Sequence, residues 1–138
     1  MAHILVIDDE QMLRRTLRAL LERAGHTVSE AEDGNQGLAQ LDVQKPDLVL
    51  TDIIMPNREG VETIGEMRRR APETPIIAMS GGGSRGGDLF LTLAEQLGAA
   101  ATLSKPIRQA ELIAAVDAAL KASLKPGADG YDARAAAR

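Results

Sequence analysis

Five polar residues each stand at the end of a short apolar run of this sequence: Asp8, Asp9, Asp52, Ser80 and Lys105. Three carboxylates crowded together repel one another unless a cation binds among them or some are protonated. Mg²⁺ prefers oxygen ligands, and one or two carboxylates plus a phosphate oxygen suit it well. A carboxylate can also attack phosphorus and form an aspartyl phosphate. If the fold gathers these residues, they could accept a phosphoryl group with the help of Mg²⁺.

The elements that must position these residues follow one another in strict alternation. Short apolar runs predict strands near residues 4–7, 27–31, 48–52, 75–80 and 100–104. Leucines and other apolar residues at helical spacing predict a helix after each strand, near residues 13–24, 37–41, 61–70, 89–97 and 112–120. This alternation indicates an α/β fold of three αβα layers, with a parallel sheet covered on both faces. The five strands favour the flavodoxin-like order 2-1-3-4-5.

That strand order assigns a role to each polar residue. Ligands of open parallel sheets bind beyond the carboxyl ends of the strands. Asp52 ends the middle strand and is the natural nucleophile, while Asp8 and Asp9 on the neighbouring strand are natural metal ligands. The Lys105 ammonium and the Ser80 hydroxyl could stabilise two further phosphoryl oxygens.

Composition sets further expectations. The chain has 138 residues, of which 44% are hydrophobic and 26% charged, which suits one folded domain. We expect that domain at residues 1–124 and a flexible tail at residues 125–138. The net charge of −4 gives no reason to expect nucleic acid as a partner. No apolar stretch predicts a signal peptide or a membrane span, so we expect a cytoplasmic protein without a membrane partner.

Four segments together resemble the response regulator receiver family, the CheY-like domains of two-component signal transduction. They are residues 7–10 (Ile-Asp-Asp-Glu), 50–56 (Leu-Thr-Asp-Ile-Ile-Met-Pro), 79–81 (Met-Ser-Gly) and 103–106 (Leu-Ser-Lys-Pro). The resemblance implies that a sensor histidine kinase or a histidine phosphotransfer protein phosphorylates Asp52. It also implies Mg²⁺ held by Asp9, Asp52 and the backbone carbonyl of Ile54, with Asp8 acting on or through a metal-bound water.

The same resemblance implies how the phosphoryl group is held. Lys105 and Ser80 would contact it, assisted by the backbone amides of Ile53 and Gly81. The peptide bond between Lys105 and Pro106 is expected to be cis, which costs little before proline. The domain would signal as a stand-alone receiver, by phosphorylation-dependent binding of an unidentified downstream protein or by passing the phosphoryl group on. It would catalyse only its own phosphorylation and dephosphorylation and would otherwise not be an enzyme.

One position departs from the family pattern. Thr102 stands where receivers often carry an aromatic switch residue, so an aromatic ring cannot relay the signal here. We hypothesise that the glycine-rich segment 81–88 takes over by becoming ordered when phosphate binds.

Three other functions compete with the receiver. A haloacid-dehalogenase-type phosphatase needs a second aspartate at position 54, where this chain has Ile54. A flavodoxin-type flavin carrier needs a phosphate-binding loop where Asp8 and Asp9 would repel the phosphate. A receiver-fold interaction module regulated without phosphorylation stays open as the main alternative.

Two groups of residues have less specific interpretations. Arg14, Arg15 and Arg18 form a basic helix face, which is either solvated or a docking surface for an acidic partner. His3 and His26 lack ligand neighbours at suitable spacing and are expected to be surface residues.

Overall fold

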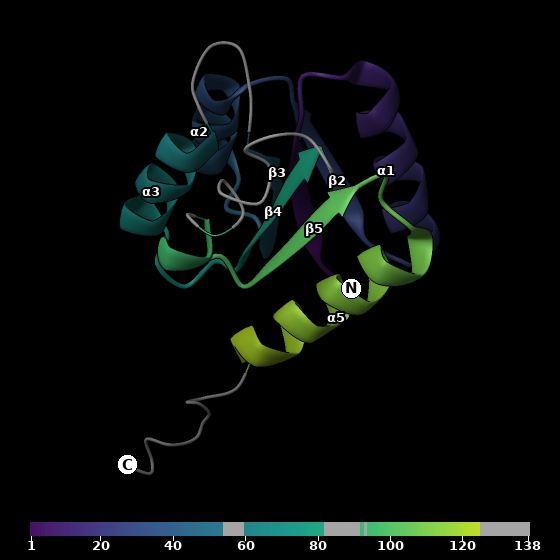
Figure 1. Ribbon diagram of the computed structural model, residues 1–138. Helices are drawn as coiled ribbons and strands as arrows, with labels where there is room; N and C mark the ends of the chain where they lie inside the picture. Colours follow the sequence, from purple (N-terminus) through teal and green to yellow (C-terminus); the bar gives the residue numbers. More distant parts are fainter. Residues whose placement is uncertain (54–59, 82–91, 93, 125–138) are drawn as a thin grey trace, which may run out of the picture.

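A computed structural model of the chain describes residues 1–53, 60–81, 92 and 94–124 and shows a parallel sheet between two layers of helices (Figure 1). The sheet has the order β2-β1-β3-β4-β5, with β1 (His3–Ile7), β2 (Thr27–Ala31), β3 (Leu48–Asp52), β4 (Ile76–Gly81) and β5 (Ala101–Lys105). The helices are α1 (Gln11–Arg23), α2 (Gly34–Val43), α3 (Gly60–Arg70) and α5 (Gln109–Leu124). Between β4 and β5, residues 92 and 94–96 are helical as well. The predicted three-layer α/β fold and strand order are confirmed.

Each face of the sheet has its own hydrophobic core. Helices α2 and α3 cover one face, and α1 and α5 cover the other (Figure 1). Side chains alternate along β1, so Leu5 and Ile7 join the core under α2 and α3, while Ile4 and Val6 join the core under α1 and α5. Burial on both faces explains why the strand is a continuous apolar run.

The register of the strands aligns their carboxyl ends. Ile7 pairs with Thr51, so Asp8 follows β1 at the level of Asp52. Asp52 in turn pairs with Met79, which places Ser80 one residue beyond it on β4. On the outer strand, Lys105 pairs with Gly81. The polar residues that end these strands therefore lie along one edge of the sheet.

Several predicted boundaries need correction. β1 begins one residue earlier than predicted, and β4 and β5 are each shifted by one residue toward the C-terminus. Leu97, predicted to line the apolar side of a fourth helix, is 37% exposed and follows the helical residues. Leu89 and Leu93, predicted for the same helix, and the tail at residues 125–138 lie outside the described residues.

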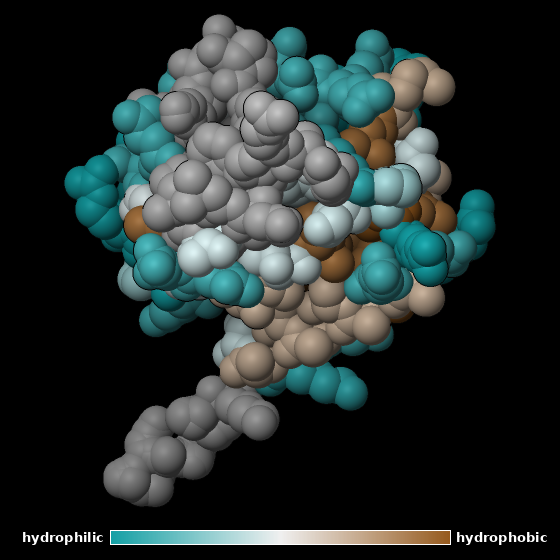
Figure 2. Space-filling view, in the orientation of Figure 1, coloured by the Kyte–Doolittle hydropathy of each residue, from teal (hydrophilic) through white to brown (hydrophobic). Residues whose placement is uncertain are grey.

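On the face that Figure 2 shows, a hydrophobic band follows α5 along the lower part of the molecule. Among the side chains of this helix that the structure describes, the exposed apolar ones are the alanines Ala110, Ala114, Ala118 and Ala122. Across the described part of the chain, none of the helices is both long enough and apolar enough to span a membrane.

Candidate functional site

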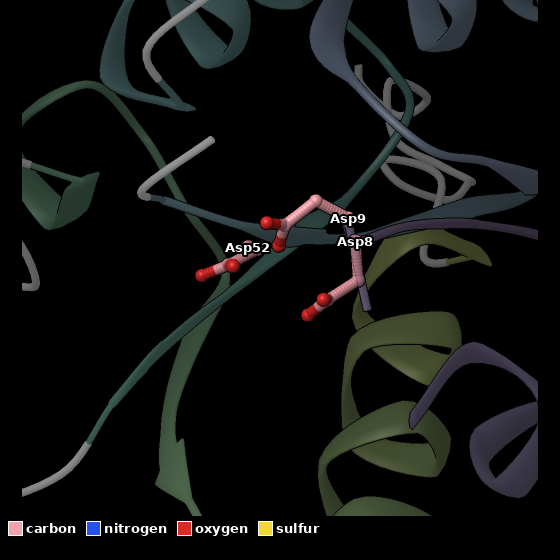
Figure 3. Close-up of side chains that lie close together, drawn as sticks. All are labelled: Asp8, Asp9 and Asp52. Atoms are coloured by element: carbon pink, nitrogen blue, oxygen red, sulfur yellow. The ribbon is translucent and has the colours of Figure 1, made fainter. Parts of the chain in front are cut away.

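Three carboxylates meet at the carboxyl edge of the sheet. Asp8 and Asp9 follow β1, and Asp52 ends β3 directly beside it. One oxygen of each carboxylate lies within 4.8 Å of the others, and Figure 3 shows the three side chains converging. Asp8 is fully buried and Asp52 is 5% exposed, whereas Asp9 is exposed to solvent. Two buried acidic groups side by side require positive charge nearby.

Lys105 supplies part of that positive charge. Its Nζ atom donates to Asp8 Oδ2 at 2.8 Å and to Asp52 Oδ2 at 3.3 Å. Burial alone would lower the pKa of the Lys105 ammonium, but the hydrogen bond to Asp8 and the charges of Asp52 and Asp8 outweigh it. The pKa is therefore raised above its usual 10.5. Lys105 thus stays charged and ties β5 to β1 and β3.

Ser80 contributes a hydroxyl group whose hydrogen bonding is incomplete. The residue is 1% exposed, and its Oγ atom has no hydrogen-bond partner within the part of the chain that the structure describes. A buried hydroxyl without a partner costs about 1–3 kcal/mol. The strand register places Ser80 next to Asp52, so an oxygen atom of a group bound to Asp52 would supply the missing partner.

The donor set fits Mg²⁺. Mg²⁺ binds hard oxygen ligands such as carboxylates and keeps several of its own water ligands. The three carboxylates lie close together, and Asp9 is exposed to solvent, which leaves room for those waters. Asp9 and Asp52 could bind the ion directly, and Asp8 could act on a metal-bound water. The fit rests on the close approach of the three carboxylates and on the burial of two of them.

Contacts within the turn between β1 and α1 hold Asp8 in place. Asp8 Oδ1 accepts a hydrogen bond from the Glu10 backbone amide at 2.9 Å. Arg14 Nη1 donates to the Asp8 carbonyl oxygen at 2.7 Å, and Arg14 Nε donates to Glu30 Oε1 at 3.0 Å. No pattern in the sequence predicts that Arg14 contacts the turn that carries the acidic residues.

A cavity of about 440 Å³ opens beside Lys105. Residues from the start of α1 and its N-cap, from the end of β4, and from the end of β5 and the segment after it line this cavity: Glu10, Leu13, Gly81, Lys105, Pro106 and Ile107. A larger hollow of about 560 Å³ near Lys45 and Glu73 is lined by none of the predicted site residues. Of the predicted site residues, Lys105 lines the smaller cavity.

Of the predictions that concern backbone groups, one is confirmed, one is wrong and others lie outside the described residues. The peptide bond between Lys105 and Pro106 is cis, as predicted. The Ile53 amide, expected to assist the phosphoryl group, instead donates to the Met79 carbonyl at 2.9 Å, which continues the pairing of β3 with β4. That expectation is wrong for this conformation. Ile54 and residues 82–88 of the glycine-rich segment lie outside the described residues, so their predicted roles stay predictions.

The remaining sequence expectations concern residues around the site. Thr102 is half-buried on the outer strand and pairs with Ala78. His3 and His26, expected on the surface, are half-buried. The His3 ring is 2.8 Å from Thr27 Oγ1 and 2.8 Å from Ser29 Oγ, and His26 Nδ1 accepts from the Ala2 amide at 3.2 Å.

Comparison with known proteins gives a consistent result. Residues 4–117 match the response regulator receiver domain family. The receiver domain of NtrX from Brucella abortus has a TM-score of 0.80 at 30% sequence identity, covering 86% of this chain and 98% of that one. The chemotaxis protein CheY4 of Vibrio cholerae has a TM-score of 0.77 at 26% identity, also covering 86% of this chain and 98% of that one.

Longer relatives match as well. The transcriptional regulatory protein CpxR of Klebsiella pneumoniae is 39% identical over 123 residues, which cover 89% of this chain and 51% of CpxR. The alkaline phosphatase synthesis transcriptional regulatory protein PhoP of Bacillus subtilis is 32% identical over 120 residues, 87% of this chain and 49% of PhoP. The chain thus spans about half the length of these curated relatives. It belongs to the response regulator receiver family of two-component signal transduction.

Proposed function

We propose that Asp52 accepts a phosphoryl group from a phosphohistidine of a sensor histidine kinase or of a histidine phosphotransfer protein. An Asp52 carboxylate oxygen forms the new bond to phosphorus as the phosphorus–nitrogen bond breaks. The imidazole nitrogen keeps the electron pair of the broken bond and takes up a proton. Bound Mg²⁺ would neutralise phosphoryl oxygens during this transfer.

The observation that carries the proposal is the convergence of Asp8, Asp9 and Asp52 within 4.8 Å beside the Lys105 ammonium. Lys105 already lies 3.3 Å from Asp52 Oδ2, so its ammonium is positioned to stabilise a phosphoryl oxygen on that carboxylate. The unpartnered Ser80 hydroxyl supports the same assignment because it can donate to a second oxygen. Asp9 and Asp52 would hold Mg²⁺, with Asp8 acting through a metal-bound water and the Ile54 carbonyl as a further ligand.

We propose that the domain transmits its signal by binding a downstream protein when phosphorylated, or by passing the phosphoryl group on. Its own chemistry would be confined to gaining and losing that group. The predicted stand-alone receiver at residues 1–124 and the expected absence of nucleic acid as a partner stay predictions. The relatives named above as transcriptional regulatory proteins are about twice as long as this chain.

Acetyl phosphate and Mg²⁺ test the chemistry directly. The intact protein should gain the mass of one phosphoryl group, and the gain should disappear when Mg²⁺ is chelated or in Asp52→Asn. Asp42→Asn is the matched control, because Asp42 is an exposed carboxylate that pairs with Arg70 away from the site. Failure of the wild-type chain to gain mass under these conditions, repeated with a phosphorylated histidine kinase, would favour the interaction module that is regulated without phosphorylation.

A further inference from the structure

We infer that Arg14 is a positioning residue that holds the turn between β1 and α1 in the geometry that Mg²⁺ requires. The inference rests on the proposed function, because it concerns the metal site of the same reaction. It gives Arg14 contacts inside the domain, whereas the sequence suggested a basic helix face that is either solvated or a docking surface.

The contacts of the Arg14 guanidinium point inward. Its Nη1 atom donates to the Asp8 carbonyl oxygen at 2.7 Å, and its Nε atom donates to Glu30 Oε1 at 3.0 Å. The Arg14 side chain is only 13% exposed. Two nitrogen atoms of one planar group therefore join α1 to the backbone of Asp8 and to β2 at the same time.

The Asp8 side chain has restraints of its own, because it accepts hydrogen bonds from the Glu10 amide at 2.9 Å and from Lys105 Nζ at 2.8 Å. Glu10, the N-cap residue of α1, makes no side-chain capping hydrogen bond, and the first turn of the helix contains no acidic residue. The Asp8 amide donates to the Ala31 carbonyl at 3.1 Å, which fixes the strand side of the residue. Arg14 fixes the opposite side, at the peptide carbonyl that connects Asp8 to Asp9. Losing that contact should let the Asp9 carboxylate move relative to Asp52.

Glu30 anchors the other end of the Arg14 guanidinium. Arg18 Nη1 lies 2.9 Å from Glu30 Oε2, and Arg18 Nε lies 3.0 Å from Glu22 Oε2. Burial would raise the pKa of Glu30, but hydrogen bonds from Arg18 and Arg14 outweigh it and lower the pKa. Glu30 is therefore ionised at neutral pH and keeps Arg14 oriented toward the turn.

Geometry and charge predict opposite effects on metal binding. If Arg14 acted only as a positive charge near the acidic cluster, its removal would strengthen Mg²⁺ binding. If it positions the turn, its removal should weaken binding despite the lost positive charge. Groups that orient metal ligands without touching the metal commonly change metal affinity by about 10–100-fold when mutated.

The experiment measures the Mg²⁺ dissociation constant by isothermal titration calorimetry for the full chain and four variants. Arg14→Met should weaken binding by about 10-fold. Arg14→Lys, which keeps the charge but cannot make both contacts, should also weaken it and serves if the methionine variant does not fold. Arg15→Met removes an exposed charge from the same helix and should change the constant less than about twofold, as should Arg18→Met, which spares the contact to Asp8.

Two results would overturn the inference, and they can be told apart. Unchanged or tighter Mg²⁺ binding in Arg14→Met and Arg14→Lys, beside a wild-type chain that binds Mg²⁺ and takes up a phosphoryl group, would overturn the role of Arg14 alone. A wild-type chain that binds no Mg²⁺ would overturn the proposed function together with the inference.

Discussion

At the scale of single residues, the site depends on competition for carboxylate oxygens. The Lys105 ammonium contacts Asp8 Oδ2 and Asp52 Oδ2, and a metal ion held by the same carboxylates must share them. The ammonium therefore has two opposing effects. It stabilises the buried acidic groups in the absence of metal, and it repels the metal when the metal binds.

Replacing Lys105 by methionine should separate these effects. Two unit charges about 4 Å apart in water interact by about 1 kcal/mol, so Lys105→Met should bind Mg²⁺ about fivefold more tightly. Phosphoryl uptake from acetyl phosphate should fall, because a group that stabilises the phosphoryl oxygens is gone. Titration calorimetry and mass spectrometry measure the two quantities. Lys45→Met, at an exposed position, is the control, and weaker Mg²⁺ binding in Lys105→Met would contradict the competition.

Two buried hydroxyls on neighbouring strands give a second test. Ser80 Oγ lacks a partner among the described residues, whereas Thr51 Oγ1 donates to the Asp52 carbonyl at 3.0 Å. Ser80→Ala should leave the free energy of unfolding unchanged or raise it by up to about 1 kcal/mol, while Thr51→Val should lower it by about 1 kcal/mol. Urea unfolding measures both. Ser80→Ala should nevertheless slow phosphoryl uptake, and an equal rate in wild type and variant would argue against a role for its hydroxyl.

At the scale of elements, the acidic residues depend on how closely helices approach the sheet. Helix α2 contacts β1 at Gly37, where an added Cβ would overlap Ile7 Cδ1 and come within 3.1 Å of Ile7 Cγ1 and 3.4 Å of Met67 Cε. Ile7 is fully buried and directly precedes Asp8. The small residue therefore permits the packing of the strand that carries the first two carboxylates.

Gly37→Ala should overpack this contact and destabilise the domain by about 1–2 kcal/mol. Gly65→Ala in α3 is the matched control, because nothing lies within 4 Å of its added Cβ. There the better helix propensity of alanine should stabilise the domain by up to about 1 kcal/mol. Urea unfolding measures whether each substitution lowers or raises the free energy of unfolding. If both substitutions raised it, α2 would have room to move away from β1.

The link between α1 and β2 should depend on pH. The pKa of Glu30 is lowered in the folded protein, so its contribution to stability is fully present above its unfolded value of 4.5 and is lost as the pH falls through the lower folded value. Glu30→Gln should cost about 1 kcal/mol at pH 7 and progressively less below pH 4.5. Urea unfolding from pH 7 to pH 3, with the exposed Glu95→Gln as control, measures this. A constant difference across that range would contradict the pairing.

At the scale of the whole molecule, most of the fold could be predicted from the sequence. Strands that alternate with helices, and strands that are buried on both faces, are compatible with few arrangements of a sheet. A continuous apolar run such as residues 4–7 is expected only in a strand buried on both faces, and the strand ends then brought Asp8 close to Asp52. The contacts of Arg14 could not be predicted in this way. Whether the long Arg14 side chain points toward solvent or toward the loop between β1 and α1 depends on Glu30, which lies on β2.

Metal binding should stabilise the entire domain. A ligand present at 10 times its dissociation constant stabilises the folded state by about 1.4 kcal/mol. Adding Mg²⁺ should therefore raise the urea midpoint of the wild-type chain, and Asp9→Asn should lose most of this shift. Asp117→Asn, an exposed residue of α5, should keep it. An equal shift in both variants would mean that Mg²⁺ acts elsewhere than on the carboxylates at the end of β1.

The pairing of Lys105 with Asp8 joins residues 97 positions apart in the chain. During synthesis on a ribosome, β1 and β3 become available early, and they are direct neighbours in the sheet. A nascent chain that stops before residue 101 has no β5 and no Lys105 to place an ammonium between the carboxylates. We therefore expect the site to be complete only when the outer strand docks against β4, late in synthesis.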